Sequence, residues 1–160
     1  MFALPSLKLS WIVTTGNRKK VKSAVEYLSV SNDTFLNAHT PIQISLAHLF
    51  KEAAPFVKQY SNTLKQNLEF AISKLNSIEN IEFIKPEGSF YLSLNLSKTK
   101  LAQKYDEESL VTTLMKKYGV FFHPGFFYDF KDGIYLILSF LCSKQKIERG
   151  IESLKDLLKI

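Results

Sequence analysis

The feature that most constrains the fold is a long apolar stripe over residues 60–78, followed by sequence with strand periodicity. Seven apolar residues recur there at three- and four-residue spacing, as on one face of a helix: Tyr60, Leu64, Leu68, Ala71, Ile72, Leu75 and Ile78. After a turn at Lys85–Gly88, the segment Phe90–Leu96 places Phe90 and three leucines at alternate positions, which predicts a strand. The two patterns together predict helices that cover a small sheet.

Shorter elements of the same two kinds fill the rest of the chain. Further strands are expected over Ile81–Ile84, which would pair with Phe90–Leu96 as a hairpin, over Val120–His123 and over Ile134–Leu141. Helices are expected over Arg18–Leu28, from Pro41 onward, from the N-cap Asp106 to the stop signal Gly119, and after the N-cap Ser143 with Ile147, Ile151, Leu154 and Leu158 inward. The predicted class is α/β, as an α+β layer.

The first fifteen residues fit this layer poorly. Leu7–Thr15 alternates like a strand and ends at Gly16, but no candidate partner follows nearby. An unpaired strand exposes a row of backbone N–H and C=O groups. The sequence therefore predicts that this strand belongs with a segment other than the helical run that follows it.

Composition narrows the function classes. With 160 residues, 46% apolar content and a single cysteine, the chain is expected to form one cytoplasmic domain without disulfides. No apolar run approaches the length of a membrane span. The net charge is 21 − 15 = +6, but the basic run Arg18–Lys22 is interpreted as a solvated helix face, and no nucleic-acid partner is expected.

Common catalytic and metal motifs are absent from the sequence. His39, His48, His123 and Cys142 lack metal-ligand spacing, so no metal is predicted. No nucleophile elbow, P-loop or dinucleotide fingerprint occurs. Two segments stand out instead: Lys85–Tyr91 joins a turn to an aromatic strand, and Val120–Phe127 joins a strand to an aromatic loop.

Four segments in collinear order resemble the C-terminal part of pyridoxal-phosphate-dependent aminotransferases of class I/II (fold type I, the aspartate aminotransferase superfamily). They are Phe2–Trp11, similar to the family's S-K-x-F-A-x-P-G-x-R-x-G-W; Asp33–Leu36 with Thr40–Gln43; Lys85–Tyr91, similar to K-P-x-G-x-F-Y; and Gly119–Phe127, similar to G-V-x-x-x-P-G-x-x-F. The resemblance implies that residues 1–40 are a remnant of the large cofactor-binding domain with one strand. Residues 41–160 would be the interdomain helix and the small domain.

The resemblance also implies a cofactor and its contacts. Pyridoxal 5'-phosphate would serve the complete enzyme, which exchanges an amino group between an amino acid and a 2-oxo acid. The Schiff-base lysine of the family falls immediately before the position of Met1, so no catalytic residue is expected within the chain and the chain alone is expected to be inactive. Lys8 stands where the family has a phosphate-binding arginine, and His39 and Thr40 would line the cofactor site.

Five residues are expected to line the substrate: Pro124, Gly125, Phe126, Phe127 and Ile137. Ile137 stands where many members have the arginine that binds the substrate α-carboxylate. A bacterial subgroup with H-P-G-x-F-F-D-F, similar to His123–Phe130, also lacks that arginine, so Ile137 is interpreted as a subgroup trait.

The partners that follow are amino acid and 2-oxo acid substrates, the N-terminal half of the enzyme, and a second copy in a homodimer. The sequence leaves three alternatives open: a non-catalytic binding or assembly module, the orphan product of a broken gene, or part of a pyridoxal-phosphate carbon–sulfur lyase.

Overall fold

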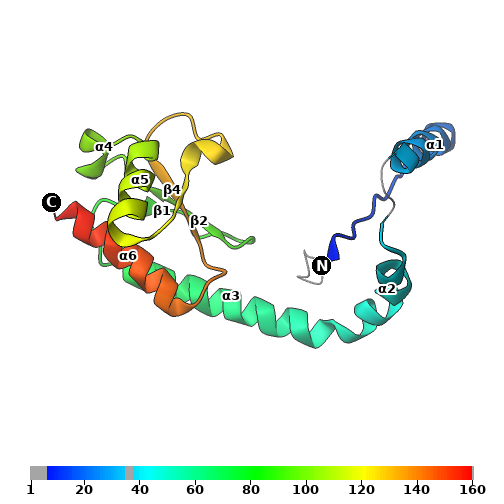
Figure 1. Ribbon diagram of the computed structural model, residues 1–160, viewed down its shortest axis with the longest axis horizontal. Helices are drawn as coiled ribbons and strands as arrows, with labels where there is room; N and C mark the ends of the chain where they lie inside the picture. The colour runs from blue at the N-terminus through cyan, green and yellow to red at the C-terminus, as the bar shows by residue number, and fades with distance from the viewer. Residues whose placement is uncertain (1–6, 35–37, 160) are drawn as a thin grey trace. The chain divides into compact units, whose positions relative to one another are not determined.

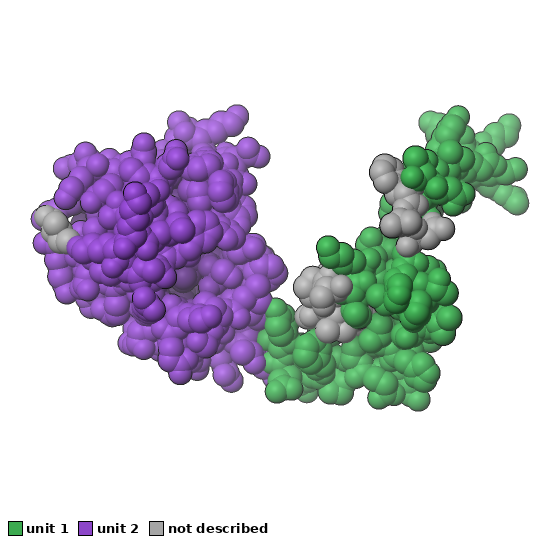
Figure 2. Space-filling model, viewed as in Figure 1, with its two compact units in different colours: residues 1–60 green, residues 61–160 purple. Residues whose placement is uncertain are grey.

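The computed structural model describes residues 7–34 and 38–159. Its contacts divide the chain into two compact units, residues 1–60 and residues 61–160, coloured green and purple in Figure 2. Figure 1 shows the helices and strands along the chain and labels most of them. The long helix α3 (Ala54–Leu75) contains the boundary between the units, so each unit is described separately.

The first unit is helical and buries little of its apolar surface. It holds α1 (Arg18–Thr34), α2 (Thr40–Glu52) and the start of α3. Helix α1 begins after Asn17, whose side-chain oxygen accepts the N–H of Lys19 at 3.1 Å. Neither α1 nor α2 contains a buried residue, although the rings of Trp11 and Phe50 lie 5.9 Å apart.

The expected strand over Leu7–Thr15 is not formed. Residues 8–15 are neither helical nor hydrogen-bonded into a sheet. Alternation of apolar residues suits a strand only where a second strand can accept its backbone hydrogen bonds, and the described residues supply none here. Helix α1 also extends six residues beyond the expected end at Leu28, because its polar C-terminal turns contain no proline or glycine.

The second unit is built on a four-stranded antiparallel sheet of order β1-β2-β4-β3. The strands are β1 (Glu82–Phe83), β2 (Tyr91–Asn95), β3 (His123–Pro124) and β4 (Tyr135–Ser139). The expected hairpin is confirmed, since β1 pairs with β2 across the turn. The strand expected over Val120–His123 is shorter and lies later, because only His123 and Pro124 pair with β4.

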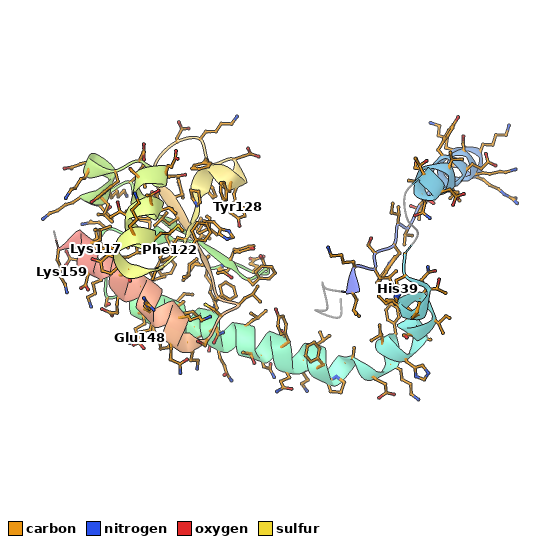
Figure 3. All side chains as sticks on the ribbon, in the orientation of Figure 1. His39, Lys117, Phe122, Tyr128, Glu148 and Lys159 are labelled. Carbon is orange, nitrogen blue, oxygen red and sulfur yellow. The ribbon has the colours of Figure 1, made fainter. Side chains whose placement is uncertain are left out.

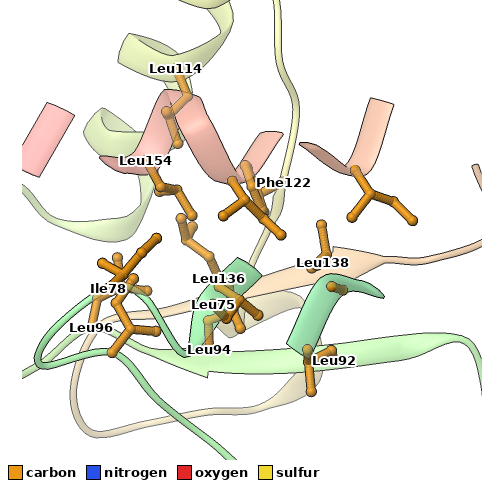
Figure 4. Close-up of a cluster of buried hydrophobic side chains, with 14 of the residues drawn as sticks. Leu75, Ile78, Leu92, Leu94, Leu96, Leu114, Phe122, Leu136, Leu138 and Leu154 are labelled. Carbon is orange, nitrogen blue, oxygen red and sulfur yellow. The ribbon is translucent and has the colours of Figure 1, made fainter. Parts of the chain in front are cut away.

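Helices cover one face of this sheet. The C-terminal part of α3, α5 (Glu107–Tyr118) and α6 (Lys144–Leu158) pack on it, and α4 (Leu101–Lys104) forms one further turn (Figure 1). The labelled core side chains meet between these helices and strands β2 and β4 (Figure 4): Leu75, Ile78, Leu92, Leu94, Leu96, Leu114, Phe122, Leu136, Leu138 and Leu154. The expected class, a small sheet covered by helices, is confirmed.

The helix ends follow the expected signals. The Asp106 side chain accepts the N–H of Ser109 at 2.8 Å and the Ser109 hydroxyl accepts the N–H of Asp106, which completes a capping box. Gly119 ends α5 at a φ of 64°, a conformation that glycine adopts without strain. In α6, Ile147, Ile151 and Leu154 are buried as expected, and Leu158 is half-buried and packs against the core.

Polar groups also secure the core. The buried amide of Asn67, on α3, donates to the carbonyl oxygens of Phe140 and Cys142 at 3.0 and 2.9 Å. Those carbonyls follow β4, so Asn67 attaches the end of the sheet to α3. Across the described ranges, no helix combines the length and apolar character that crossing a membrane requires.

Candidate functional site

The face of the sheet that points away from the core leucines carries a mixture of aromatic, polar and aliphatic side chains. Side chains alternate along each strand, so the core leucines of β2 and β4 point to one face and their neighbours to the other. The outward set is Tyr91, Ser93, Asn95, Tyr135, Ile137 and Ser139. Ile137 is only 4% exposed although it is not part of the core cluster.

The register of the strands aligns three residues across this face. Ile137 of β4 lies opposite His123 of β3 on one side and opposite Ser93 of β2 on the other. Directly opposed residues in antiparallel strands project from the same face. The imidazole of His123 is therefore a cross-strand neighbour of the Ile137 side chain.

His123 belongs to a compact aromatic cluster. Its Nδ1 atom lies 2.7 Å from the Tyr128 hydroxyl oxygen, and the Tyr91 ring centroid lies 5.6 Å from that of His123. Figure 3 shows Tyr128 on the segment between β3 and β4. Partial burial, together with a hydrogen bond to Tyr91, raises the pKa of Tyr128 above that of a free phenol. The phenol therefore stays protonated at neutral pH.

A tight turn, η2 (Gly125–Tyr128), leads from β3 into the loop before β4. It ends at Asp129, whose φ of 60° lies in the left-handed region that aspartate tolerates better than most residues. Gly125 is buried, whereas Phe126 and Phe127 are 50% and 63% exposed with their rings perpendicular at 5.0 Å. The turn is thus anchored at the buried Gly125 and exposes the two aromatic side chains that follow it.

The five residues that were expected to line a substrate lie in β3, in the turn after it and in β4, but they do not share one face of the sheet. Pro124 lies opposite the core residue Leu136 and so projects to the core face, whereas Ile137 projects to the other face. Pro124, Gly125 and Ile137 are buried, and Phe126 and Phe127 are the exposed members of the set. Their role toward a substrate stays a prediction.

The three residues that were expected to contact a cofactor lie in the first unit and are exposed. Lys8 has a φ of 50°, an uncommon conformation for a residue with a side chain. His39, labelled in Figure 3, precedes α2 as its N-cap without a side-chain capping bond, and Thr40 is the first residue of α2. Residues 1–6 and 35–37, within the first two of the four motif segments, lie outside the described residues.

The sequence expectations missed Glu107, a charged residue that is only 8% exposed. Its two carboxylate oxygens accept the backbone N–H groups of Phe126 and Tyr135 at 2.8 and 2.7 Å. A signal was present, because Glu107 precedes Leu110 and Val111 by three and four residues and so shares their inward helix face. Tyr91 and Tyr128 stood in the quoted motifs, but only the fold brings them to His123.

The described part of the chain contains no cluster of residues that could bind a metal ion. No three residues among histidine, cysteine, aspartate and glutamate gather there as candidate ligands. Cys142 is half-buried, and its Sγ atom lies 3.5 Å from the carbonyl oxygen of Ser139.

Comparison with known proteins finds similarity to aminotransferases in sequence and in fold. No protein-family model matches the chain. A probable aspartate/prephenate aminotransferase of Aquifex aeolicus is 23% identical over 158 residues, which are 98% of this chain and 38% of that protein. A PLP-dependent aminotransferase of Streptococcus suis superposes with a TM-score of 0.73 at 20% identity, over 98% of this chain and 39% of the other.

The resemblance to fold type I aminotransferases is confirmed. An aminotransferase of Mycobacterium tuberculosis agrees, with a TM-score of 0.73 at 19% identity over 89% of this chain and 36% of its own. The aspartate aminotransferase of Thermotoga maritima superposes with a TM-score of 0.68 at 23% identity, over 90% of this chain and 34% of its own. The chain thus has the fold of part of these aminotransferases, and it spans under two-fifths of the length of these relatives.

Proposed function

We propose that residues 1–160 are the C-terminal part of a pyridoxal-phosphate-dependent aminotransferase, which transfers an amino group between an amino acid and a 2-oxo acid. The observation that carries the proposal is the match to the Streptococcus suis aminotransferase over 98% of the chain. The four collinear motifs support it, because they fall in the same order as in the superfamily.

The donor set of the first unit suits the phosphate of the cofactor. An ammonium, a hydroxyl and an imidazole are all groups that can donate hydrogen bonds to phosphate oxygens, and Lys8, Thr40 and His39 supply them from exposed positions. Pyridoxal phosphate supplies the electron sink that amino-group transfer requires. Lys8 would hold the phosphate as a point charge, without the bidentate geometry of an arginine.

The turn η2 would meet the substrate, beside the strand β4 that carries Ile137. Phe126 and Phe127 are exposed apolar rings that can pack against a substrate side chain and displace water from it. Ile137 carries no charge, so it would contribute shape rather than a carboxylate contact. An apolar or aromatic amino acid is the substrate class that these residues favour.

Residues 1–160 alone should not transfer amino groups, because the resemblance assigns none of their lysines to the cofactor-binding position. The chain is incubated with pyridoxal phosphate, an amino acid and a 2-oxo acid, then reduced with borohydride. We expect no amino transfer and only the diffuse labelling of exposed lysines that pyridoxal without phosphate also gives. Stoichiometric labelling of a single lysine that requires the phosphate group would contradict this proposal.

The DNA upstream of the first codon tests the assignment of the whole protein. We expect a coding stretch for S-x-S-K there, in frame or one frame removed. The longer protein that contains this stretch should transfer amino groups from an amino acid to a 2-oxo acid. Release of a thiol instead would identify a carbon–sulfur lyase, and absence of the stretch would favour a non-catalytic module or an orphan gene product.

The remaining proposals concern the complete protein. We place residues 1–40 with a large cofactor-binding domain and residues 41–160 with the interdomain helix and small domain. The complete enzyme is proposed to be a cytoplasmic homodimer. Sedimentation of the longer protein at several concentrations measures the oligomeric state, and a monomer at all of them would contradict the dimer.

A further inference from the structure

Glu107 is a buried carboxylate of the second unit, and both of its oxygens have backbone partners. It is the first residue of α5, directly after the N-cap Asp106, and it is 8% exposed. Its Oε2 accepts the N–H of Phe126 at 2.8 Å and its Oε1 accepts the N–H of Tyr135 at 2.7 Å. Burial of a charge is costly unless such bonds replace its hydration, so the two amides account for the position of this carboxylate.

The two amides belong to different segments. Phe126 lies in the turn η2, whereas Tyr135 is the first residue of β4. The intervening loop, residues 129–134, connects them along the chain but contains no regular element. One side chain on α5 therefore fixes the distance between the turn and the strand that carries Ile137.

The backbone of the turn is shaped to receive this carboxylate. A Cβ atom on Gly125 would lie 2.6 Å from Oε1 of Glu107 and 2.6 Å from Cβ of Tyr135. Real Cβ atoms do not approach other atoms so closely. Glycine at this position thus permits the contact between the carboxylate and the turn.

We propose that Glu107 is the positioning residue of the substrate-lining turn: its two hydrogen bonds set where Phe126, Phe127 and Tyr128 stand relative to β4. The consequence reaches the aromatic cluster, because Tyr128 ends the turn and its hydroxyl lies 2.7 Å from Nδ1 of His123. This inference rests on the proposed function only for the statement that the turn meets a substrate.

Accepting two backbone N–H groups requires two acceptor oxygens, and this requirement distinguishes glutamate from glutamine. Glutamine has one oxygen and one amino group, so in Glu107→Gln one backbone N–H would face another donor. Aspartate keeps both oxygens but lies one methylene short, so in Glu107→Asp the carboxylate reaches one amide at the expense of the other. Glu108, the next residue, is exposed and provides the matched control Glu108→Gln with the same loss of charge in the first turn of α5.

Amide hydrogen exchange of the 160-residue chain, resolved by NMR, tests the proposal without any activity measurement. In Glu107→Gln we expect exchange at Phe126, Tyr135 or both to accelerate at least about tenfold more than at core amides such as Leu94, since hydrogen bonds to charged groups are the strong ones. The ¹⁵N resonance of His123 Nδ1 should shift as its contact with Tyr128 loosens. Glu108→Gln should change neither.

Two outcomes would overturn the proposal. One is uniform acceleration at Phe126, Tyr135 and Leu94, which a general loss of stability produces; the other is unchanged exchange at both turn amides. If Glu107→Gln does not fold, Glu107→Asp gives the same reading, with one of the two amides expected to stay protected. Because the exchange experiment needs neither cofactor nor substrate, its result is separate from that of the amino-transfer assay.

Discussion

Nδ1 of His123 lies 2.7 Å from the phenolic oxygen of Tyr128, across the start of the turn that links β3 to β4. The two rings are nearly parallel, with an interplanar angle of 15°. The Tyr91 ring lies edge-on to that of Tyr128 at 5.7 Å. Three titratable aromatic side chains therefore meet on the sheet face that carries Ile137.

This cluster gives the first prediction, on the ionisation of Tyr128. Its raised pKa, caused first by burial and then by the hydrogen bond to Tyr91, means that it ionises at a higher pH than a free phenol. A phenol with a raised folded pKa contributes stability below its unfolded pKa, and that contribution is lost as the pH rises above about 10. Tyr128→Phe should remove a late step from a spectrophotometric tyrosine titration and weaken the fall of stability above that pH.

The matched control is Tyr27→Phe, since Tyr27 is 73% exposed on α1. It should leave the late step in place, because it does not alter Tyr128. Loss of the late step in Tyr27→Phe, or its survival in Tyr128→Phe, would show that the raised pKa belongs elsewhere.

The second prediction compares two glycines. In Gly125→Ala the new Cβ would lie 2.6 Å from Cβ of Tyr135, an atom fixed by β4, so the turn must move. We expect a cost of about 1–3 kcal/mol, the range for overpacked sites, measured by urea unfolding. Gly88→Ala is the control, because a Cβ there meets nothing within 4 Å. Equal unfolding midpoints for the two variants would contradict the close approach at Gly125.

The third prediction concerns the amide of Asn67. Its replacement in Asn67→Ala leaves the carbonyl oxygens of Phe140 and Cys142 without their donor. The free energy of unfolding should fall by about 1–3 kcal/mol. Asn67→Asp should cost more, because a carboxylate would face two carbonyl oxygens.

Asn76→Ala serves as the reference for Asn67, since the Asn76 side chain is exposed just beyond the end of α3. Its effect should stay within about 0.5 kcal/mol. If Asn67→Ala were as mild as this reference, the two buried hydrogen bonds would not stabilise the unit.

The fourth prediction concerns acid pH and the N-cap of α5. Hydrogen bonds from the side chain and backbone N–H of Ser109 hold the pKa of Asp106 below that of a free aspartate. A carboxyl with a lowered folded pKa stabilises the fold above its unfolded pKa, and this contribution is lost as the pH falls below about 4.

Asp106→Asn isolates this effect, because asparagine is an equally good N-cap without a charge. The difference in urea midpoint between wild type and Asp106→Asn should therefore shift in favour of the variant as the pH falls. Glu108→Gln, on the same helix turn, gives the reference. A difference independent of pH would mean that Asp106 is not ionised in the capping box.

Sequence periodicity was sufficient wherever an element's partner lay close along the chain. The hairpin of β1 with β2 and the cap and stop of α5 follow from local chemistry, and the structure has them. The helix expected over residues 60–78 is present as α3, but it begins earlier, at Ala54, and ends earlier, at Leu75. The expected strand over Leu7–Thr15 failed for the complementary reason. Alternation describes a face that could pair, whereas a strand exists only where another backbone accepts its hydrogen bonds.

The candidate site divides in the same way. The sequence by itself determined which residues form the turn Gly125–Tyr128, because proline, glycine and the aromatic run are local signals. Only the tertiary structure decided that His123 lies opposite Ile137 and that Glu107 holds the turn against β4. Strand register and a bond between residues nineteen apart depend on packing of the whole unit, and no local propensity encodes them.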